Sequence, residues 1–194
     1  MLRDSETAPL QTSMHRAVEH RALMAIAIAD LGAANTTTLT LSALDRGWTM
    51  FAHTSPRGTA FDQTDGPDAV AAVWQALGAL HRHQIAHGDL RASEITVDAG
   101  TALFGGFGSS EYGASEEQMQ SDIAQLLVTT TSKFGAEPSV RAAIAEFGTD
   151  TVLNASRRLT RSALPPRLRR SLGDAKTVRE AITAVLKQLP ADGY

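Results

Sequence analysis

The sequence contains no cysteine, and lysine is almost missing from it. Without cysteine the chain cannot form a disulfide, bind a metal through thiolates or use a cysteine nucleophile. Fifteen of its basic residues are arginines, and its three lysines are Lys133, Lys176 and Lys187. Any chemistry that requires a lysine ammonium before position 133 is therefore excluded.

Long apolar runs and a strong net charge are also missing. No stretch approaches the roughly 20 apolar residues of a membrane-spanning helix, and the N-terminus lacks the pattern of a signal peptide. The net charge is −3 over 194 residues, so no basic field predicts nucleic acid as a partner. Hydrophobic residues make up 43% of the chain, which is ordinary for a globular protein. The composition predicts a cytoplasmic globular domain.

Hydrophobic periodicity predicts the order of the elements. Apolar residues at three- and four-residue steps favour an amphipathic helix over 13–31. Residues 36–44 and 48–54 are rich in β-branched and aromatic side chains, and the Asp-Arg-Gly between them favours a β-hairpin. The other expected elements are a loop at 55–66, a helix at 67–83, short strands at 95–97 and 101–104, a helix at 115–134 with a capping box, and helices at 137–147, 149–160, 166–172 and 175–188.

This order is typical of an α+β fold with a mostly helical second half. Residues 1–12 are polar, and we expect a flexible lead-in there. We expect one domain over 13–190. Its N-terminal part, 13–56, would be a helix and a hairpin, and its helical part would span 67–190.

Two motifs in the middle of the chain carry the candidate chemistry. HGDLRASE occupies positions 87–94, and LFGGFG follows at 103–108. Phosphoryl transfer depends mainly on positioning and charge neutralisation, so a loop aspartate followed by a glycine-rich turn indicates a phosphotransferase-type site.

Together with the short strands expected beside them, these motifs resemble the catalytic core of the protein-kinase-like superfamily, in its aminoglycoside-phosphotransferase and atypical-kinase branch. VEHRALMAIA, LHRHQIAHGDLR and SDIAQLL are similar to the kinase-like cytoplasmic domain of actinobacterial membrane proteins. In those proteins the domain precedes a lysylphosphatidylglycerol-synthase or flippase-type transmembrane region. The resemblance covers about 13–190 and implies a kinase-like fold dominated by its helical C-lobe, with a truncated N-lobe.

The resemblance implies a role for individual residues. Asp89 matches the catalytic-loop aspartate and is the candidate base. Glu94 stands where the family has a metal-binding asparagine, and Gly106 stands where it has a metal-binding aspartate. Glu19 matches the helix glutamate, but its usual lysine partner cannot exist upstream because no lysine precedes Lys133. The resemblance thus implies a loop that has lost most of its metal- and phosphate-handling groups.

The remaining site residues follow from the same resemblance. Glu19, Arg91 and Glu94 are candidate nucleotide-binding residues, and Glu94 is the candidate metal ligand. His87 and Asp122 are expected to be structural anchors of the loop. No cofactor is expected in a non-catalytic domain, whereas an active one would use ATP and Mg²⁺.

These residues support three hypotheses about function. The leading hypothesis is a non-catalytic pseudokinase-type regulatory or protein-interaction domain, cytoplasmic and located at the inner face of the plasma membrane, linked to a cell-envelope lipid-handling membrane protein. One alternative is an active metal-dependent phosphotransferase that acts on a small molecule or a protein, with Asp89 as its base. The other is a nucleotide-sensing domain that transfers no phosphate.

Two surfaces are candidate contacts for a protein partner, the chain's own membrane domain or a second copy. If the N-lobe is truncated, the hairpin residues Trp48, Met50 and Phe51 should be exposed and mark an oligomer or partner interface. A basic stretch near the C-terminus predicts either solvated helix faces or contact with an anionic membrane surface or an acidic protein. Its arginines are Arg157, Arg158, Arg161, Arg167, Arg169 and Arg170.

Overall fold

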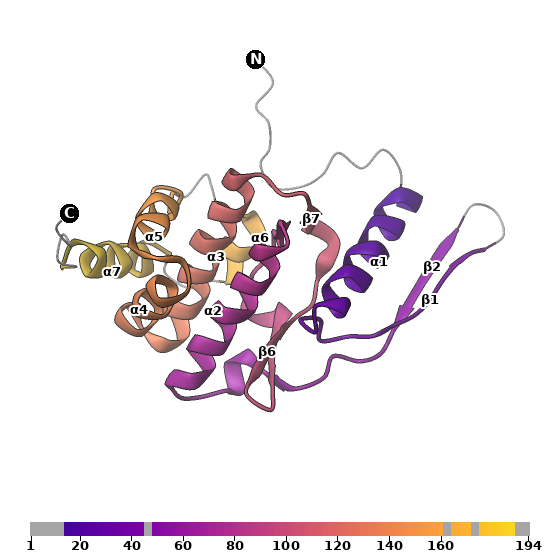
Figure 1. The fold of residues 1–194 in the computed structure, drawn as a ribbon, viewed down its shortest axis with the longest axis horizontal. Coiled ribbons are helices and arrows are strands. Elements are labelled where there is room, and N and C mark those ends of the chain that lie inside the picture. The colour runs from indigo at the N-terminus through magenta and orange to yellow at the C-terminus, as the bar shows by residue number, and fades with distance from the viewer. Residues whose placement is uncertain (1–13, 45–47, 161–163, 172–174, 189–194) are drawn as a thin grey trace, which may run out of the picture.

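The computed structural model describes residues 14–44, 48–160, 164–171 and 175–188. They form a mixed α+β fold in which helices predominate (Figure 1). The helices are α1 (Met14–Asp30), α2 (Pro67–Arg82), α3 (Glu116–Phe134), α4 (Ala136–Phe147), α5 (Thr149–Ser156), α6 (Pro166–Ser171) and α7 (Ala175–Gln188). No helix in these ranges is both long and apolar enough to span a membrane.

The strands form three small antiparallel sheets within the described ranges. Strands β1 and β2 form the hairpin that the sequence predicts, although its turn at 45–47 lies outside the described residues. Strand β5 pairs with β6 on one side and with the short β3 on the other, and β4 pairs with β7. The strand bounds are β1 Thr38–Ala43, β2 Thr49–His53, β3 Thr59–Ala60, β4 Ile85–Ala86, β5 Ile95–Asp98, β6 Thr101–Phe104 and β7 Glu111–Tyr112.

The segment 55–66 is not the plain loop that its polar composition predicts. It contains β3 and a 3-10 turn at Phe61–Gln63. Phe61 is fully buried and packs edge to face against Phe134, with ring centroids 5.5 Å apart. A single buried aromatic residue in a polar stretch has no periodicity, so the sequence pattern could not reveal this attachment.

Helix α5 is shorter than the predicted range of 149–160. It ends at Ser156, and the amides of Arg157, Arg158 and Leu159 bond to carbonyls three residues back. Such bonds tighten the chain into turns and do not continue the α-helix. The buried side chain of Leu159 still belongs to the core, which explains why the apolar pattern extends past the helix end.

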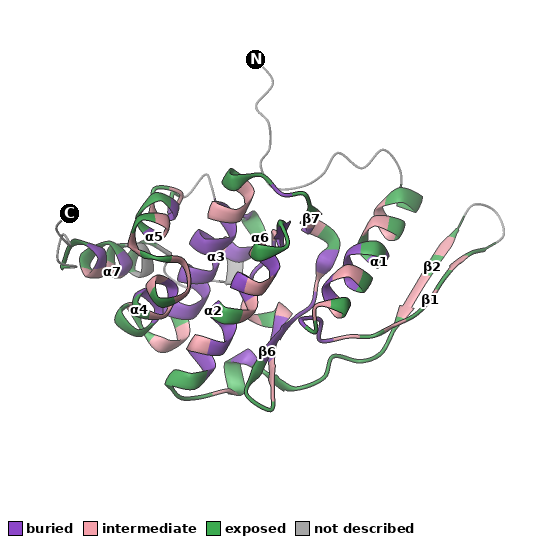
Figure 2. Ribbon diagram, in the orientation of Figure 1, coloured by how far each residue is buried: buried purple, intermediate pink, exposed green. Residues whose placement is uncertain are grey.

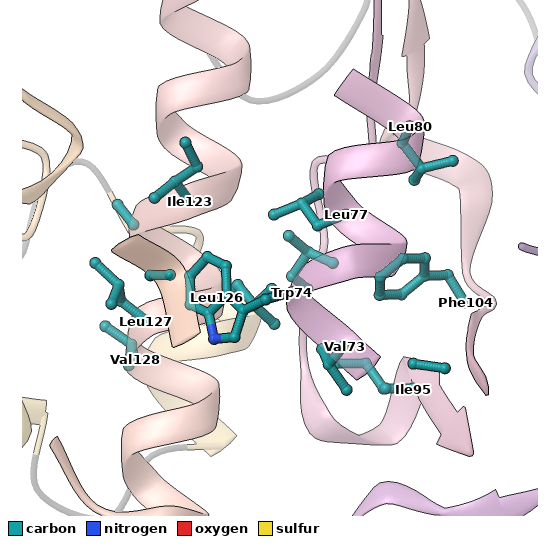
Figure 3. Close-up of a cluster of buried hydrophobic side chains, with 14 of the residues drawn as sticks. Val73, Trp74, Leu77, Leu80, Ile95, Phe104, Ile123, Leu126, Leu127 and Val128 are labelled. Atoms are coloured by element: carbon teal, nitrogen blue, oxygen red, sulfur yellow. The ribbon is translucent and has the colours of Figure 1, made fainter. Parts of the chain in front are cut away.

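The core lies between α2, α3 and the β5–β6 hairpin (Figure 3). Trp74 of α2 points toward Leu126 of α3 and meets the ring of Phe147 edge to face, with centroids 6.1 Å apart. Its side chain is fully buried. Phe104 of β6 and Ile95 of β5 cover the opposite side of α2. Each such large apolar side chain contributes about 1.5–3 kcal/mol through burial.

Helix α1 and the β1–β2 hairpin lie beside this core, at the end of the molecule away from α4, α5 and α7 (Figure 1). They join it through Ala34, which forms a parallel bridge to Phe104, and through the buried α1 residues Met24 and Ile28. Within the described residues, no third strand joins the hairpin. Much of the hairpin and of the outer face of α1 is therefore exposed (Figure 2).

Candidate functional site

The loop that begins at His87 is tied to α3 through a buried carboxylate. Asp122 is fully buried and accepts hydrogen bonds from the backbone amides of His87 at 2.6 Å and Gly88 at 2.8 Å. His81 Nε2 of α2 lies 3.3 Å from the same carboxylate. The structure thus places Asp122 against the loop that it was expected to anchor.

Two further residues on the same face of α3 hold the loop, and the sequence pattern did not reveal them. Gln125 Oε1 accepts a hydrogen bond from the amide of Leu90 at 3.1 Å, and the hydroxyl of Thr129 donates to the carbonyl of Leu90 at 2.6 Å. Both are buried. Their positions three and seven residues after Asp122 place all three on one helix face, which is the signal that could have identified them.

His87 is fully buried, and its hydrogen bonds fit a neutral imidazole. Its Nε2–H donates to the carbonyl of Gly105 at 2.8 Å, and its Nδ1 accepts from the amide of Asp89 at 3.2 Å. The ring also packs against Phe104 and Phe107. Burial lowers the pKa of His87, which agrees with a ring whose second nitrogen faces an N–H donor. His87 is thus a packing and hydrogen-bonding residue of the loop.

Arg91 bridges the two carboxylates of the loop. Its Nε and Nη2 donate to Asp89 Oδ1 and Oδ2 at 2.7 and 2.9 Å, and Nη2 also donates to Glu94 Oε1 at 2.7 Å. Asp89 is buried, and the other two side chains are mostly covered. The hydrogen bond to Asp89 raises the pKa of Arg91 above its usual value. The guanidinium therefore occupies the position between the carboxylates that a bound cation would need.

Gly106 and Glu94 depend on each other sterically. Gly106 has φ +73° and ψ 34°, in the left-handed region that favours glycine. A Cβ at this position would collide with the carboxylate of Glu94. Glu94 thus fills the space that a side chain on residue 106 would enter.

Of the three glycines in the turn, Gly106 alone has a positive φ. Gly105 and Gly108 have negative φ, and the space beside Gly105 is filled by the side-chain amide of Asn35. Gly105 is therefore required by close packing, and a Cβ at Gly108 would meet nothing within 4 Å.

A cavity of about 700 Å³ opens beside this loop. Its walls are the loop, the glycine turn, one face of α1 and the segment that leads into α6. Arg21 of α1 and Arg167 of α6 line it together with Arg91, Asp89 and Glu94. Sequence patterns did not place Arg21 or Arg167 at this loop, because only the tertiary fold brings these distant segments together.

Glu19 does not belong to this cavity, contrary to its assignment as a nucleotide-binding residue. Its carboxylate pairs with His15 at 2.9 Å and is about half exposed. The α1 residues that line the cavity are Met14, Ala17, Val18 and Arg21, which recur at helical spacing. Glu19 is two residues from Arg21, so the helix turns it to a different face.

The basic stretch does not present all six arginines in the same way. Arg157 and Arg167 are exposed, whereas Arg158 and Arg169 are half-buried and interact with other groups of the chain. Arg161 and the side chain of Arg170 lie outside the described residues.

Exposed apolar side chains concentrate at the N-terminal end of the described structure. Ten large apolar residues are exposed in the described ranges, and eight of them lie in α1 or in and beside β1–β2. Trp48 is 71% exposed and Met50 is 41% exposed. The expectation of exposure was wrong for Phe51, which is half-buried and packs against the core.

The residues present do not fit the Mg²⁺ that an active kinase-like site would use. Gly106 offers no side-chain ligand, and Arg91 already pairs with both nearby carboxylates. In the described ranges, no three His, Cys, Asp or Glu side chains group together in a way that could hold a metal ion.

No protein-family model matches the chain, and no curated protein was found to be similar to it.

Proposed function

We propose that this chain is a non-catalytic, pseudokinase-type regulatory or protein-interaction domain. The ion pairs of Arg91 with Asp89 and Glu94 are the observation that carries this proposal. A base must accept a proton from the acceptor hydroxyl, but both oxygens of Asp89 already accept hydrogen bonds from Arg91.

The rest of the site supports the same function. Phosphoryl transfer needs metal ions to neutralise the phosphates. A ligand is missing at Gly106, and the described residues that line the cavity include no lysine. By contrast, the contacts of Asp122, Gln125 and Thr129 that shape the loop are complete. In the described part of the chain, the contacts that fold the loop are present, and this supports a loop retained for its shape.

The surface of the N-terminal end supports an interaction role. Strand residues alternate between faces, and Thr49 on one face contacts His15 of α1. Trp48 and Met50 therefore project from the other face, away from α1, together with the exposed Leu44. An apolar cluster with an exposed tryptophan is typical of a protein-binding surface. From the sequence resemblance, we propose a partner among lipid-handling membrane proteins at the inner face of the plasma membrane.

The test combines a phosphoryl-transfer assay with thermal unfolding in ATP and Mg²⁺. We expect no transfer to water, protein or aminoglycoside acceptors and no stabilisation that depends on Mg²⁺. A functional metal–nucleotide site would be visible, since a hundredfold excess over Kd stabilises by about 2.7 kcal/mol.

Two variants make this test specific. Glu94→Gln should leave the result with ATP and Mg²⁺ unchanged, as should Glu137→Gln, which removes an ion-paired carboxylate outside the cavity. Phosphoryl transfer by the wild type that is lost in Asp89→Asn would overturn the proposal, as would Mg²⁺-dependent stabilisation that disappears only in Glu94→Gln.

A further inference from the structure

Neither edge of the β1–β2 hairpin is paired with another strand in the described part of the chain. The amide of Leu44 donates to the carbonyl of Trp48, so these two residues form a hydrogen-bonded pair of the ladder. Along antiparallel strands, such pairs alternate with pairs whose backbone groups point outward. The register is regular from Thr40 to Ala43, and the amides and carbonyls of Leu41 and Ala43 therefore point away from β2.

The more open of the two edges is that of β1, because α1 and the core cover part of β2. Thr49 of β2 contacts His15 of α1, and Phe51 packs against the core. Ala43 and Leu41 lie opposite these two strand residues and on the same face of the hairpin, yet both are exposed. The cover of this face therefore ends at β2, and a further strand beside β1 would meet apolar side chains.

The edge of β1 lacks the side chains with which proteins usually protect an open strand. Such strands commonly carry charged residues or proline, which hinder pairing with another chain. β1 (Thr38–Ala43) and β2 (Thr49–His53) contain no aspartate, glutamate, lysine, arginine or proline. A register shift between Thr38 and Thr40 distorts the start of β1 but leaves the rest of its edge regular. An unprotected edge of this kind is a site for pairing with a further strand.

We infer that two copies of this chain associate by antiparallel pairing of their β1 edges, about a two-fold axis. A strand paired with an identical antiparallel strand is self-complementary, because each copy supplies the same donors and acceptors. The two hairpins then form one four-stranded sheet. Leu41 and Ala43 of each copy face the same segment of the other, and apolar side chains opposite each other across strands stabilise a sheet.

Charge favours a second copy over a different protein as the partner. Because β1 and β2 carry no acidic side chain, lysine or arginine, two identical edges meet without like-charge repulsion. The same composition leaves no charge pattern in these strands with which a different protein could be selected. The edge is short, so the contact is at the small end of interface sizes, and we expect a reversible dimer with a Kd in the micromolar range.

This dimer does not rest on the proposed function and uses a different surface. Trp48 and Met50 lie on the face of the hairpin directed away from α1, whereas the pairing uses the outer edge of β1. The face with Trp48 therefore remains open to another protein when the two copies are paired.

The test is sedimentation equilibrium of the chain from about 1 µM to 1 mM, a range that brackets a micromolar Kd. Leu41→Lys should raise the dissociation constant of the dimer about tenfold or more, because it places two ammonium groups across the shared edge. Met50→Lys is the matched control, since Met50 is 41% exposed against 42% for Leu41 and lies on the other face. Its dissociation constant should equal that of the wild type.

Single cysteine variants provide a second measurement, because the chain contains no cysteine of its own. Antiparallel pairing brings opposite Cα atoms about 4.5–5.5 Å apart, within the range of a disulfide. Leu41→Cys, Ser42→Cys and Ala43→Cys lie along the edge. At least one of them should form a covalent dimer under mild oxidation, whereas Met50→Cys should remain mostly monomeric. These variants also decide the matter if Leu41→Lys does not fold.

Three results would overturn the inference: a monomer throughout this concentration range, a dimer that Leu41→Lys leaves unchanged, or no covalent dimer from any of the three edge variants. A dimer weakened only by Met50→Lys would place the contact on the face of Trp48. A monomeric chain that binds a lipid-handling membrane protein would refute only the dimer, and phosphoryl transfer by a dimeric chain would refute only the proposed function.

Discussion

The two ends of the described structure use their apolar residues in opposite ways. Around Trp74, α2 and α3 bury their apolar side chains against each other and against β5–β6. Around Trp48, α1 and the β1–β2 hairpin leave many of theirs exposed. Both tryptophans lie in segments that the periodicity predicts well, so the difference is not one of secondary structure. A two-stranded hairpin simply has one face for which the described residues provide no cover.

The largest expected effect is at the buried tryptophan. Trp74→Ala should lower the free energy of unfolding by about 3–5 kcal/mol, because it leaves a cavity between α2 and α3. Urea unfolding followed by circular dichroism measures this loss. A loss below about 1 kcal/mol would mean that the α2–α3 core is not packed as described.

The anchor of the loop ranks next. Asp122→Ala should cost about 3 kcal/mol, because two buried backbone amides lose a charged acceptor. Asp122→Asn keeps one acceptor oxygen and should cost less. The free energies of unfolding of both variants can be compared with that of Asp150→Asn, a control in the first turn of α5. Losses in both Asp122 variants no larger than that of Asp150→Asn would show that the carboxylate does not anchor the loop.

The buried His87 predicts a loss of stability in acid. Burial lowers its pKa in the folded protein, so below about pH 6.5 the unfolded chain binds a proton that the folded chain does not. This contribution is complete above pH 6.5 and declines as the pH falls from there toward the folded pKa, at up to about 1.4 kcal/mol per pH unit.

Unfolding midpoints measured between pH 8 and 5 give the slope of stability against pH, to which His87 contributes. The slope should become shallower in His87→Asn and remain in His53→Asn, which alters an exposed histidine. An unchanged slope in His87→Asn would assign the acid sensitivity to other groups.

The smallest expected effect is at the exposed tryptophan. Trp48→Ser should change the free energy of unfolding by less than about 0.5 kcal/mol, because its side chain buries little surface. It should nevertheless reduce binding of 1-anilinonaphthalene-8-sulfonate. A destabilisation as large as that of Trp74→Ala would show that the two ends of the structure are equally well packed.

Some features of the fold could be predicted from the sequence because they are local. The capping box of Ser115 and Gln118 forms as the spacing predicts, and α1, α2 and the β1–β2 hairpin lie close to their expected positions. The α+β class follows from the same patterns. Each depends on residues within a few positions of one another, which is what periodicity and capping signals describe.

Other features required the folded chain. The pairing of β4 with β7 joins segments of two residues each, which are too short to show alternation. Glu19 was expected at the site, but the rotation of α1 places Arg21 there and directs Glu19 elsewhere. A position matched by resemblance identifies the residue but not the direction of its side chain.

The sequence by itself determined the chemical inventory of the loop: an aspartate, an arginine, a glutamate and a glycine at positions 89, 91, 94 and 106, with no lysine before position 133. Only the tertiary structure decided how these groups are used. It turned Arg91 onto both carboxylates and placed Glu94 over Gly106. It also brought Arg21 and Arg167 to one cavity from opposite ends of the chain. The physical reason is that charge pairing acts through space over a few ångströms, whereas sequence patterns report only neighbours along the chain.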